Sequence, residues 1–205
     1  MLEFEGIRFG FTSENKNDSP ALIRQVHGKG IVTFNETAVE EADGILTSRE
    51  HQPIHVFTAD CIPLLFFSLN PEAPIAAIHC GWRGAMRGIV GEAVKHFSSF
   101  WDTTHVIVGP SLLNCCFEVK EDFFDEFSRE HQALSEFTKT HGPRTYFDTL
   151  GFVLDRQLKT LPNNRLHLDY SRCTFCTQPE LPSFRRDKNR NSSIKAWIEK
   201  TTRPF

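Results

Sequence analysis

The first half of this chain is divided into short apolar runs, and polar residues, glycine or proline separate one run from the next. Runs of this length between turn-forming residues are typical of strands rather than helices. The interruptions include Asn-Pro-Glu-Ala-Pro at residues 70–74 and Gly-Pro-Ser at residues 109–111. We therefore predict strands at residues 7–11, 21–26, 31–34, 44–47, 54–58, 64–68, 75–79 and 106–108.

Apolar residues three and four positions apart predict helices later in the chain. Ile89, Ala93 and Phe97 have this spacing directly after a Gly-Trp-Arg-Gly turn, and it recurs across residues 123–137 and 153–161. Alternation at residues 194–198 predicts a last strand. Many short strands with few helices indicate an α+β fold with layered mixed sheets. No linker divides the 205 residues, which predicts one domain over residues 1–205.

Charge and hydropathy argue against several classes of partner. The net charge is −3 without a block of like charges, so neither nucleic acid nor an acidic membrane surface is expected as a partner. The mixed basic segment at residues 185–190 is short, so we interpret it as a local anion-binding loop rather than a nucleic-acid site. The acidic N-terminus lacks the apolar stretch of a secretion signal, and the longest apolar run, residues 62–67, is too short to span a bilayer. We expect a cytoplasmic protein with reduced cysteines.

His27, Cys61 and His79 each stand where an apolar run gives way to small or polar residues. Two imidazoles and a thiolate suit Zn²⁺, and three protein ligands leave the fourth tetrahedral position open, as in catalytic zinc sites. An open position lets the ion activate water or polarise a substrate. The ordinary alternative is that each residue is a buried thiol or a hydrogen-bonded structural histidine.

The blocks that contain these residues resemble motifs of the laccase-domain, or polyphenol oxidase, family. They are Gln-Val-His-Gly at residues 25–28, Ala-Asp-Cys-Ile-Pro at 59–63 and the highly specific His-Cys-Gly-Trp-Arg-Gly at 79–84. The segment at residues 109–119, which contains Cys-Cys-Phe-Glu-Val, is similar to a fourth motif. Residues 42–47, 173–174 and 183–187 match further blocks in order.

The resemblance implies a four-layer α/β/β/α fold with zinc on His27, Cys61 and His79, where copper could substitute. It also implies phosphorolysis of adenosine, inosine and methylthioadenosine, with some adenosine deamination. The small-molecule partners would then be a nucleoside and phosphate. Cys61 and His79 would be catalytic as well as metal ligands.

The sequence departs from the family pattern in three places. Members usually begin with a longer segment that carries a helix before the first histidine motif, whereas a short polar connection, residues 14–20, precedes that motif here. Phe117 replaces the usual tyrosine, and Lys188 stands where a glycine is expected after Asp187. The shortened N-terminal segment bears on substrate range and rate rather than on the metal ligands.

Several charged residues near the motifs are candidates for substrate and proton chemistry. Arg83 lies in a glycine-flanked turn that we expect to open a helix, so it is a candidate ligand for phosphate or another substrate anion. The alternative is that Arg83 bonds carbonyl groups of the turn. Arg185 and Arg186 are further phosphate candidates. Either Glu118 or Asp60 could move the proton in a deamination.

The remaining cysteine pairs give weak signals. Neighbouring residues rarely reach disulfide geometry, so Cys115 and Cys116 are not expected to pair with each other. Cys173-x-x-Cys176 is typical of zinc and thioredoxin-like sites. Because the sequence shows no matching second pair and no thioredoxin-like strand–helix context, we expect neither a second metal nor a redox role.

Other functions remain compatible with the same residues. One is a metal-free cysteine hydrolase, such as an amidase that acts on a cell-wall precursor, with Cys61 as nucleophile and His79 as base. Copper-dependent phenol oxidation ranks lower, because the chain has no His-x-His pair and one three-ligand site cannot form a multicopper cluster. A non-enzymatic zinc clip would require a closed four-ligand site.

Overall fold

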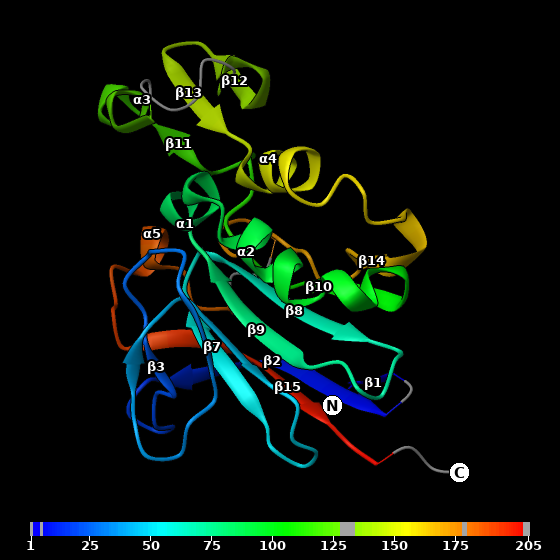
Figure 1. Ribbon diagram of the computed structural model, residues 1–205. Coiled ribbons are helices and arrows are strands. Elements are labelled where there is room, and N and C mark those ends of the chain that lie inside the picture. The colour runs from blue at the N-terminus through cyan, green and yellow to red at the C-terminus, as the bar shows by residue number, and fades with distance from the viewer. Residues whose placement is uncertain (1, 5, 128–133, 178–179, 203–205) are drawn as a thin grey trace.

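A computed structural model describes residues 2–4, 6–127, 134–177 and 180–202 (Figure 1). The helices are α1 (Trp82–Arg87), α2 (Ile89–His96), α3 (Glu121–Phe127), α4 (Thr149–Arg156) and α5 (Phe184–Asp187), with 3-10 turns η1 (Ser98–Thr103), η2 (Leu134–Phe137) and η3 (Asn163–Arg165). The strands are β1 (Leu2–Phe4), β2 (Ile7–Asn15), β3 (Ile23–Arg24), β4 (Ile31–Thr33), β5 (Glu40–Glu41), β6 (Gly44–Thr47), β7 (Ile54–Thr58), β8 (Ile62–Ser68), β9 (Ile75–Cys80), β10 (Thr104–Val108), β11 (Glu118–Val119), β12 (Thr138–His141), β13 (Arg144–Phe147), β14 (Leu166–His167) and β15 (Ser192–Lys200).

Two sheets lie face to face, and helices cover one of them. The six-stranded sheet has the order β14-β10-β8-β9-β6-β4, with parallel pairs at its two edges and antiparallel pairs between them. Helices α1, α2 and α4 lie on one side of it, and the antiparallel sheet β1-β2-β15-β7 lies on the other (Figure 1). Strands β11, β13 and β12 form a small separate sheet, next to α3.

Strand β8 shows why the central runs are apolar without alternation. Leu64 and Phe66 belong to the core under the helices, whereas Leu65 and Phe67 belong to the core between the sheets. All four side chains are completely buried. Successive strand residues point to opposite faces, so a strand covered on both faces is apolar at every position.

The α+β class with layered mixed sheets is confirmed, and most predicted strands are present. The predicted strand at residues 21–26 is reduced to β3. The helix predicted from residues 153–161 begins earlier, at Thr149, because the Asp148 carboxylate accepts a hydrogen bond from the Gly151 amide and caps the first turn. The helix predicted across residues 123–137 is α3 followed by η2, and the residues between them lie outside the described chain.

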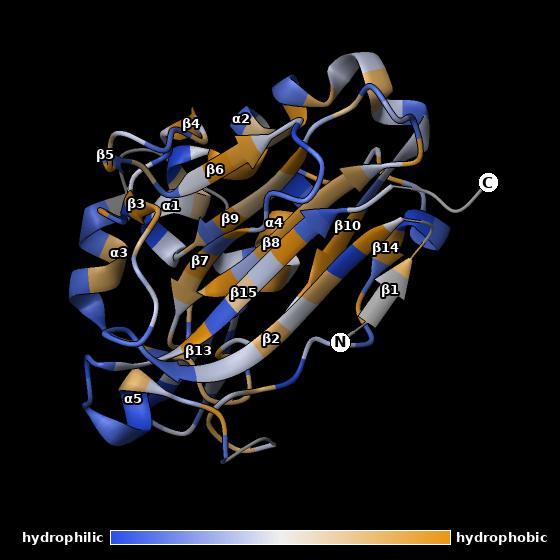
Figure 2. Cartoon of the chain, turned by 90° about the horizontal axis from the view of Figure 1, so that it is seen from below, coloured by the Kyte–Doolittle hydropathy of each residue, from blue (hydrophilic) through white to orange (hydrophobic). Residues whose placement is uncertain are grey.

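The outer face of the four-stranded sheet differs from the four-layer arrangement that the resemblance implied. Figure 2 looks onto this face, and no helix of the described residues crosses it. The connection after β2 explains the difference, because it makes a turn in which the Asp18 amide donates to the Asn15 carbonyl. Lys195, Trp197 and Glu199 of β15 are partly exposed, while the alternate residues are buried.

None of the helices in the described ranges has the length and apolar character needed to cross a membrane.

Gly109 lies at a close approach between the two sheets and tests the packing directly. A methyl group at this position would overlap the ring of Phe11 and lie 2.7 Å from Cγ of Pro63. Overpacking of this kind costs roughly 1–3 kcal/mol, so we expect Gly109→Ala to lower the free energy of unfolding by that amount in a urea titration. The control Gly91→Ala adds a methyl into open space on α2 and should instead stabilise the protein by roughly 0.5–1 kcal/mol. Equal stability of Gly109→Ala and the original chain would contradict the packing.

Candidate metal centre

His27, Cys61 and His79 come from separate segments and meet at one place. His79 lies in β9, Cys61 directly precedes β8, and His27 follows β3. Strands β8 and β9 are paired, so the residue two positions after Cys61 lies opposite His79. The donor atoms of the three residues all lie within 4.8 Å of one another, and the two histidine rings are 4.8 Å apart between centroids. This group could hold one metal ion.

A buried carboxylate, that of Asp43, fixes two of these residues. Its Oδ1 lies 2.8 Å from Nδ1 of His79. The same carboxylate accepts hydrogen bonds from the backbone amides of His27 (2.9 Å) and Gly28 (2.5 Å). With Nδ1 of His79 engaged by Asp43, Nε2 is the nitrogen left for a ligand. Carboxylate–histidine pairs orient metal ligands in this way.

The strand register places Asp43 beside His79. Gly44 of β6 lies opposite Ile78 of β9, and the His79 amide donates to the Asp43 carbonyl at 2.7 Å. In the sequence, residues 42–47 match the family only as a block, and the match gives Asp43 no role. The available signal was an acidic residue placed directly before the apolar run that begins at Gly44.

The turn that carries His27 is held from both sides. Gln25 makes two hydrogen bonds to the backbone of Phe57, at 2.7 and 2.8 Å, so its side chain takes the place of a strand partner. The guanidinium of Arg87 donates to the His27 carbonyl at 3.0 Å. His27 itself has a φ of 60°, which is uncommon for a residue with a side chain. These contacts hold the backbone of the turn in this conformation, in which the His27 ring lies beside Cys61 and His79.

Residue 81, the first glycine of the His-Cys-Gly-Trp-Arg-Gly motif, lies against the donor side chains. A Cβ at residue 81 would lie 3.1 Å from Sγ of Cys61 and 3.1 Å from Cδ2 of His27. Both distances are tighter than ordinary van der Waals contact. Glycine therefore leaves the room that two of the three donor side chains occupy.

The charges of the group favour a thiolate. Burial acts to raise the pKa of Cys61, but His79 and His27 outweigh it and lower this pKa to about 6. Burial likewise acts to lower the pKa of His79, while Cys61 and Asp43 raise it to about 9. The thiolate is the form of cysteine that binds metals and attacks electrophiles. Both kinds of chemistry are open to Cys61.

A small cavity of about 60 Å³ lies beside Cys61. This volume is well below that of typical small-molecule sites, which enclose about 300–1,000 Å³. The wall is mostly apolar and contains two aromatic side chains, Trp82 and Phe117. The lining residues are Asp60, Cys61, Ile62, Cys80, Trp82, Leu112, Phe117 and Thr149.

The two candidate proton carriers lie in different places. Asp60 lines the cavity, and its carboxylate accepts hydrogen bonds from Oγ1 of Thr174 (2.8 Å) and the Arg185 amide (2.6 Å). Glu118 lies in β11 of the small sheet, and its carboxylate is 4.0 Å from Arg144. Neither carboxylate belongs to the group of three donors, so we do not assign either residue as a fourth metal ligand.

The candidate anion-binding arginines already have partners. Arg83 of α1 makes two hydrogen bonds of 2.8 Å to Glu126 and stacks on Trp82, with Cζ 4.0 Å from the ring centroid. Arg186 is paired with Asp187 and also donates to two carbonyl groups, so it is a structural residue. Arg185 donates to the Glu118 carbonyl at 3.1 Å. Arg83 is the best anion-binding candidate of the three, because a substrate anion would have to displace only the exposed carboxylate of Glu126.

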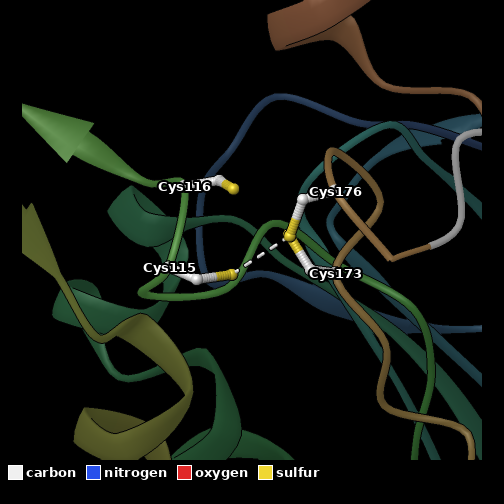
Figure 3. Close-up of side chains that lie close together, drawn as sticks. All are labelled: Cys115, Cys116, Cys173 and Cys176. Carbon is white, nitrogen blue, oxygen red and sulfur yellow. Dashed lines mark hydrogen bonds between the residues drawn. The ribbon is translucent and has the colours of Figure 1, made fainter.

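A second group of donors corrects the expectation that Cys173-x-x-Cys176 lacks a matching pair. The structure brings Cys115 and Cys116 to it, and the four sulfur atoms all lie within 4.8 Å of one another (Figure 3). The sequence could not show this pairing, because it depends on how two distant loops meet.

Comparison with known proteins identifies the family. A family profile described as "Multi-copper polyphenol oxidoreductase laccase" matches residues 10–198. The chain belongs to this family. Its resemblance to the laccase-domain family, drawn from the motifs, is thereby confirmed.

Curated relatives in this family carry the name purine nucleoside phosphorylase. One, from Aquifex aeolicus, is 31% identical over 161 residues, which is 77% of this chain and 71% of the relative. Another, "Purine nucleoside phosphorylase YfiH" from Escherichia coli, is 29% identical over 180 residues, covering 87% of this chain and 73% of the relative.

Two solved structures share the fold. The Bacillus licheniformis hypothetical protein YfiH matches with a TM-score of 0.75 at 20% identity, over 88% of this chain and 74% of that chain. YlmD from Geobacillus stearothermophilus matches with a TM-score of 0.73 at 24% identity, over 89% of this chain and 73% of that chain. At these identities the likeness establishes the fold alone.

Asp43 provides a test of the metal centre that leaves all three donors in place. Asp43→Asn removes the negative charge that supports His79, and loss of such a partner typically weakens metal affinity about 10–100-fold. We expect this loss in a competitive zinc titration against a chromogenic chelator. The control Glu92→Gln removes one negative charge on α2 and should leave the affinity unchanged. Unaltered zinc affinity in Asp43→Asn would show that the carboxylate does not support a ligand.

Proposed function

We propose that this protein is a zinc-dependent purine nucleoside phosphorylase. The observation that carries the proposal is the three-donor group of His27, Cys61 and His79 at the edge of an apolar cavity. The names of the curated relatives support the reaction class. Adenosine, inosine and methylthioadenosine are the proposed substrates, with adenosine deamination as a side activity.

The donor set fits Zn²⁺ better than copper. Two imidazole nitrogens and one thiolate sulfur are ligands that zinc takes in tetrahedral sites, and three protein ligands leave room for a reactant. Bound there, zinc would supply Lewis acidity. The family description names several coppers, but the histidine-containing donor group of the described residues is a single set of three. Copper could occupy this set as a substitute.

The side chains around the cavity have roles in phosphorolysis. In this reaction a phosphate oxygen forms a bond to C1′ of the ribose while the bond from C1′ to N9 of the purine breaks. The bonding electrons go to the purine, which takes up a proton. Trp82 and Phe117 offer aromatic faces to the purine, and the apolar wall excludes water that would compete with phosphate.

Arg83 and Asp60 would complete the site. A guanidinium binds phosphate oxygens through two parallel hydrogen bonds, which is the geometry that Arg83 now gives to Glu126. Phosphate would therefore replace the Glu126 carboxylate. The position of Asp60 in the cavity wall supports it over Glu118 as the group that handles the purine proton.

A cysteine hydrolase remains a second candidate because Cys61, His79 and Asp43 also resemble a nucleophile, its base and an orienting carboxylate. Such an enzyme would act as an amidase without a metal. The two candidates differ in their response to chelation, because only the phosphorylase would lose activity when zinc is removed and regain it when zinc returns.

The primary test follows hypoxanthine release from inosine in the presence of phosphate. We expect release by the purified protein, loss after treatment with a chelator, and recovery when zinc is restored. His79→Ala should reduce release to background, because it removes one of three ligands. Hypoxanthine production no greater than in His79→Ala would refute the phosphorylase. Hydrolysis of an amide substrate that persists after complete zinc removal would favour the hydrolase.

The phosphate role of Arg83 is tested by Arg83→Met. A hydrogen bond to a charged group contributes roughly 1.5–3 kcal/mol, so we expect the KM for phosphate to rise about tenfold or more. The KM for inosine should change little. Arg49→Met is a matched control, because Arg49 is also exposed and paired with a glutamate, Glu36. Arg49 follows the end of β6, whereas Asp43 of the metal centre precedes the start of this strand. An unchanged phosphate KM in Arg83→Met would exclude this role.

A further inference from the structure

Four cysteines from two loops form a cluster apart from the three-donor group. Cys115 and Cys116 lie in the first loop, residues 109–117, which joins β10 to β11. Cys173 and Cys176 lie in the second loop, residues 170–177, which follows β14. In Figure 3 the sulfur atoms of Cys115 and Cys116 point toward those of the other pair. Sixty or so residues separate the pairs in the sequence, so the fold alone brings them together.

The backbone sets the position of the two loops. Ser111 and Cys173 form a parallel bridge between them. The Ser111 amide donates to the Arg172 carbonyl, and the Thr174 amide donates to the Ser111 carbonyl, each at 3.0 Å. The cysteine side chains therefore extend from a hydrogen-bonded junction, which limits how far the sulfur atoms can separate.

The sulfur positions match a tetrahedral metal site. All four lie within 4.8 Å of one another, and Cys115 and Cys176 are 3.6 Å apart. Four thiolates at the usual zinc–sulfur distance of about 2.3 Å have sulfur–sulfur edges of about 3.8 Å. Backbone amides of Leu113, Phe175 and Cys176 also donate to the Cys173 sulfur, as outer-shell donors commonly do for metal-bound thiolates.

Apolar packing does not explain this cluster. Unliganded cysteines are among the most buried residues and behave as small apolar side chains. Cys115 and Cys176 are both exposed, Cys116 is partly exposed, and only Cys173 is buried. All four are free cysteines. Exposed sulfur atoms gain little from burial, so their convergence needs another cause.

We propose that Cys115, Cys116, Cys173 and Cys176 bind one Zn²⁺ in a structural site that is separate from the three-donor centre. Four protein ligands close the coordination sphere, which is the mark of structural rather than catalytic zinc. The CxxC half of the site supplies the usual close pair, and the adjacent cysteines supply the second pair. The site binds metal through this chain's own residues and does not depend on the proposed phosphorylase activity.

The ion would tie together two loops that build the cavity. Leu112 and Phe117 of the first loop line the cavity wall. Thr174 of the second loop donates to the Asp60 carboxylate, which lines the same cavity. A cross-link between these loops would hold the wall in shape, so the second zinc would support the site from outside without touching the substrate.

The test counts zinc in the full-length protein, which is purified under reducing conditions, loaded with Zn²⁺ and desalted. We expect two zinc ions per chain in the original protein. Cys115→Ser and Cys176→Ser should each retain one, and both should fold because these positions are exposed. His79→Ala should also retain one, held by the cysteines. Cys80→Ala, which removes a thiol outside the cluster, should still hold two.

Cobalt distinguishes the two sites by their ligands. In the His79→Ala background, Co²⁺ should give an intense sulfur-to-cobalt charge-transfer band, and adding Cys176→Ser should abolish it. X-ray absorption of the zinc form in this background should show a shell of sulfur at about 2.3 Å. Metal binding at the cysteine cluster in His79→Ala would support this proposal even if the protein shows no phosphorylase activity. The two proposals can therefore fail independently.

Two results would overturn the proposal. One is a single zinc per chain that disappears in His79→Ala and is unaffected by Cys176→Ser. The other is a disulfide between Cys115 and Cys176 in protein prepared under reducing conditions, detected by intact mass after alkylation, with no metal on the cluster.

Discussion

The buried carboxylate of Asp43 is the constraint on which the site depends. A charge without solvent is costly unless hydrogen bonds replace the lost water. Burial acts to raise the pKa of Asp43, but the His79 ring and the amides of Gly28 and His27 outweigh it and lower this pKa. The charge is therefore compensated only when the His27 turn and the His79 ring are both in place. One buried group thus couples β6, β9 and the turn after β3.

The fold delivers the donors to this carboxylate through strand pairing. Strands β8 and β9 are buried on both faces and form the rigid centre of the molecule. Cys61 and His79 lie at one end of this pair, where apolar residues give way to the chain segments that enclose the cavity. Because core strands have few alternative positions, side chains at their ends are held with little freedom. His27 enters from a loop and needs the additional contacts of Gln25 and Arg87.

Sequence reasoning worked best where one local pattern determines the structure. Strands such as β8 and β9 are predicted because continuous apolar runs bounded by proline and polar residues are visible in the sequence. The short polar strands β5 and β12 were missed, because two to four residues of this character carry no periodic signal. The three donor residues were identified from their motifs. The contact of Asp43 with His79 and the meeting of the two cysteine pairs depend on register and loop placement, which no local pattern encodes.

Zinc-edge anomalous diffraction from crystals of the purified protein tests the central claim most directly. The account predicts an anomalous peak about 2.0–2.1 Å from a nitrogen of each of His27 and His79, and about 2.3 Å from the Cys61 sulfur. It also predicts that Asp43 remains bonded to Nδ1 of His79 when the ion is bound. A zinc-saturated crystal with no peak among these three residues would contradict the account.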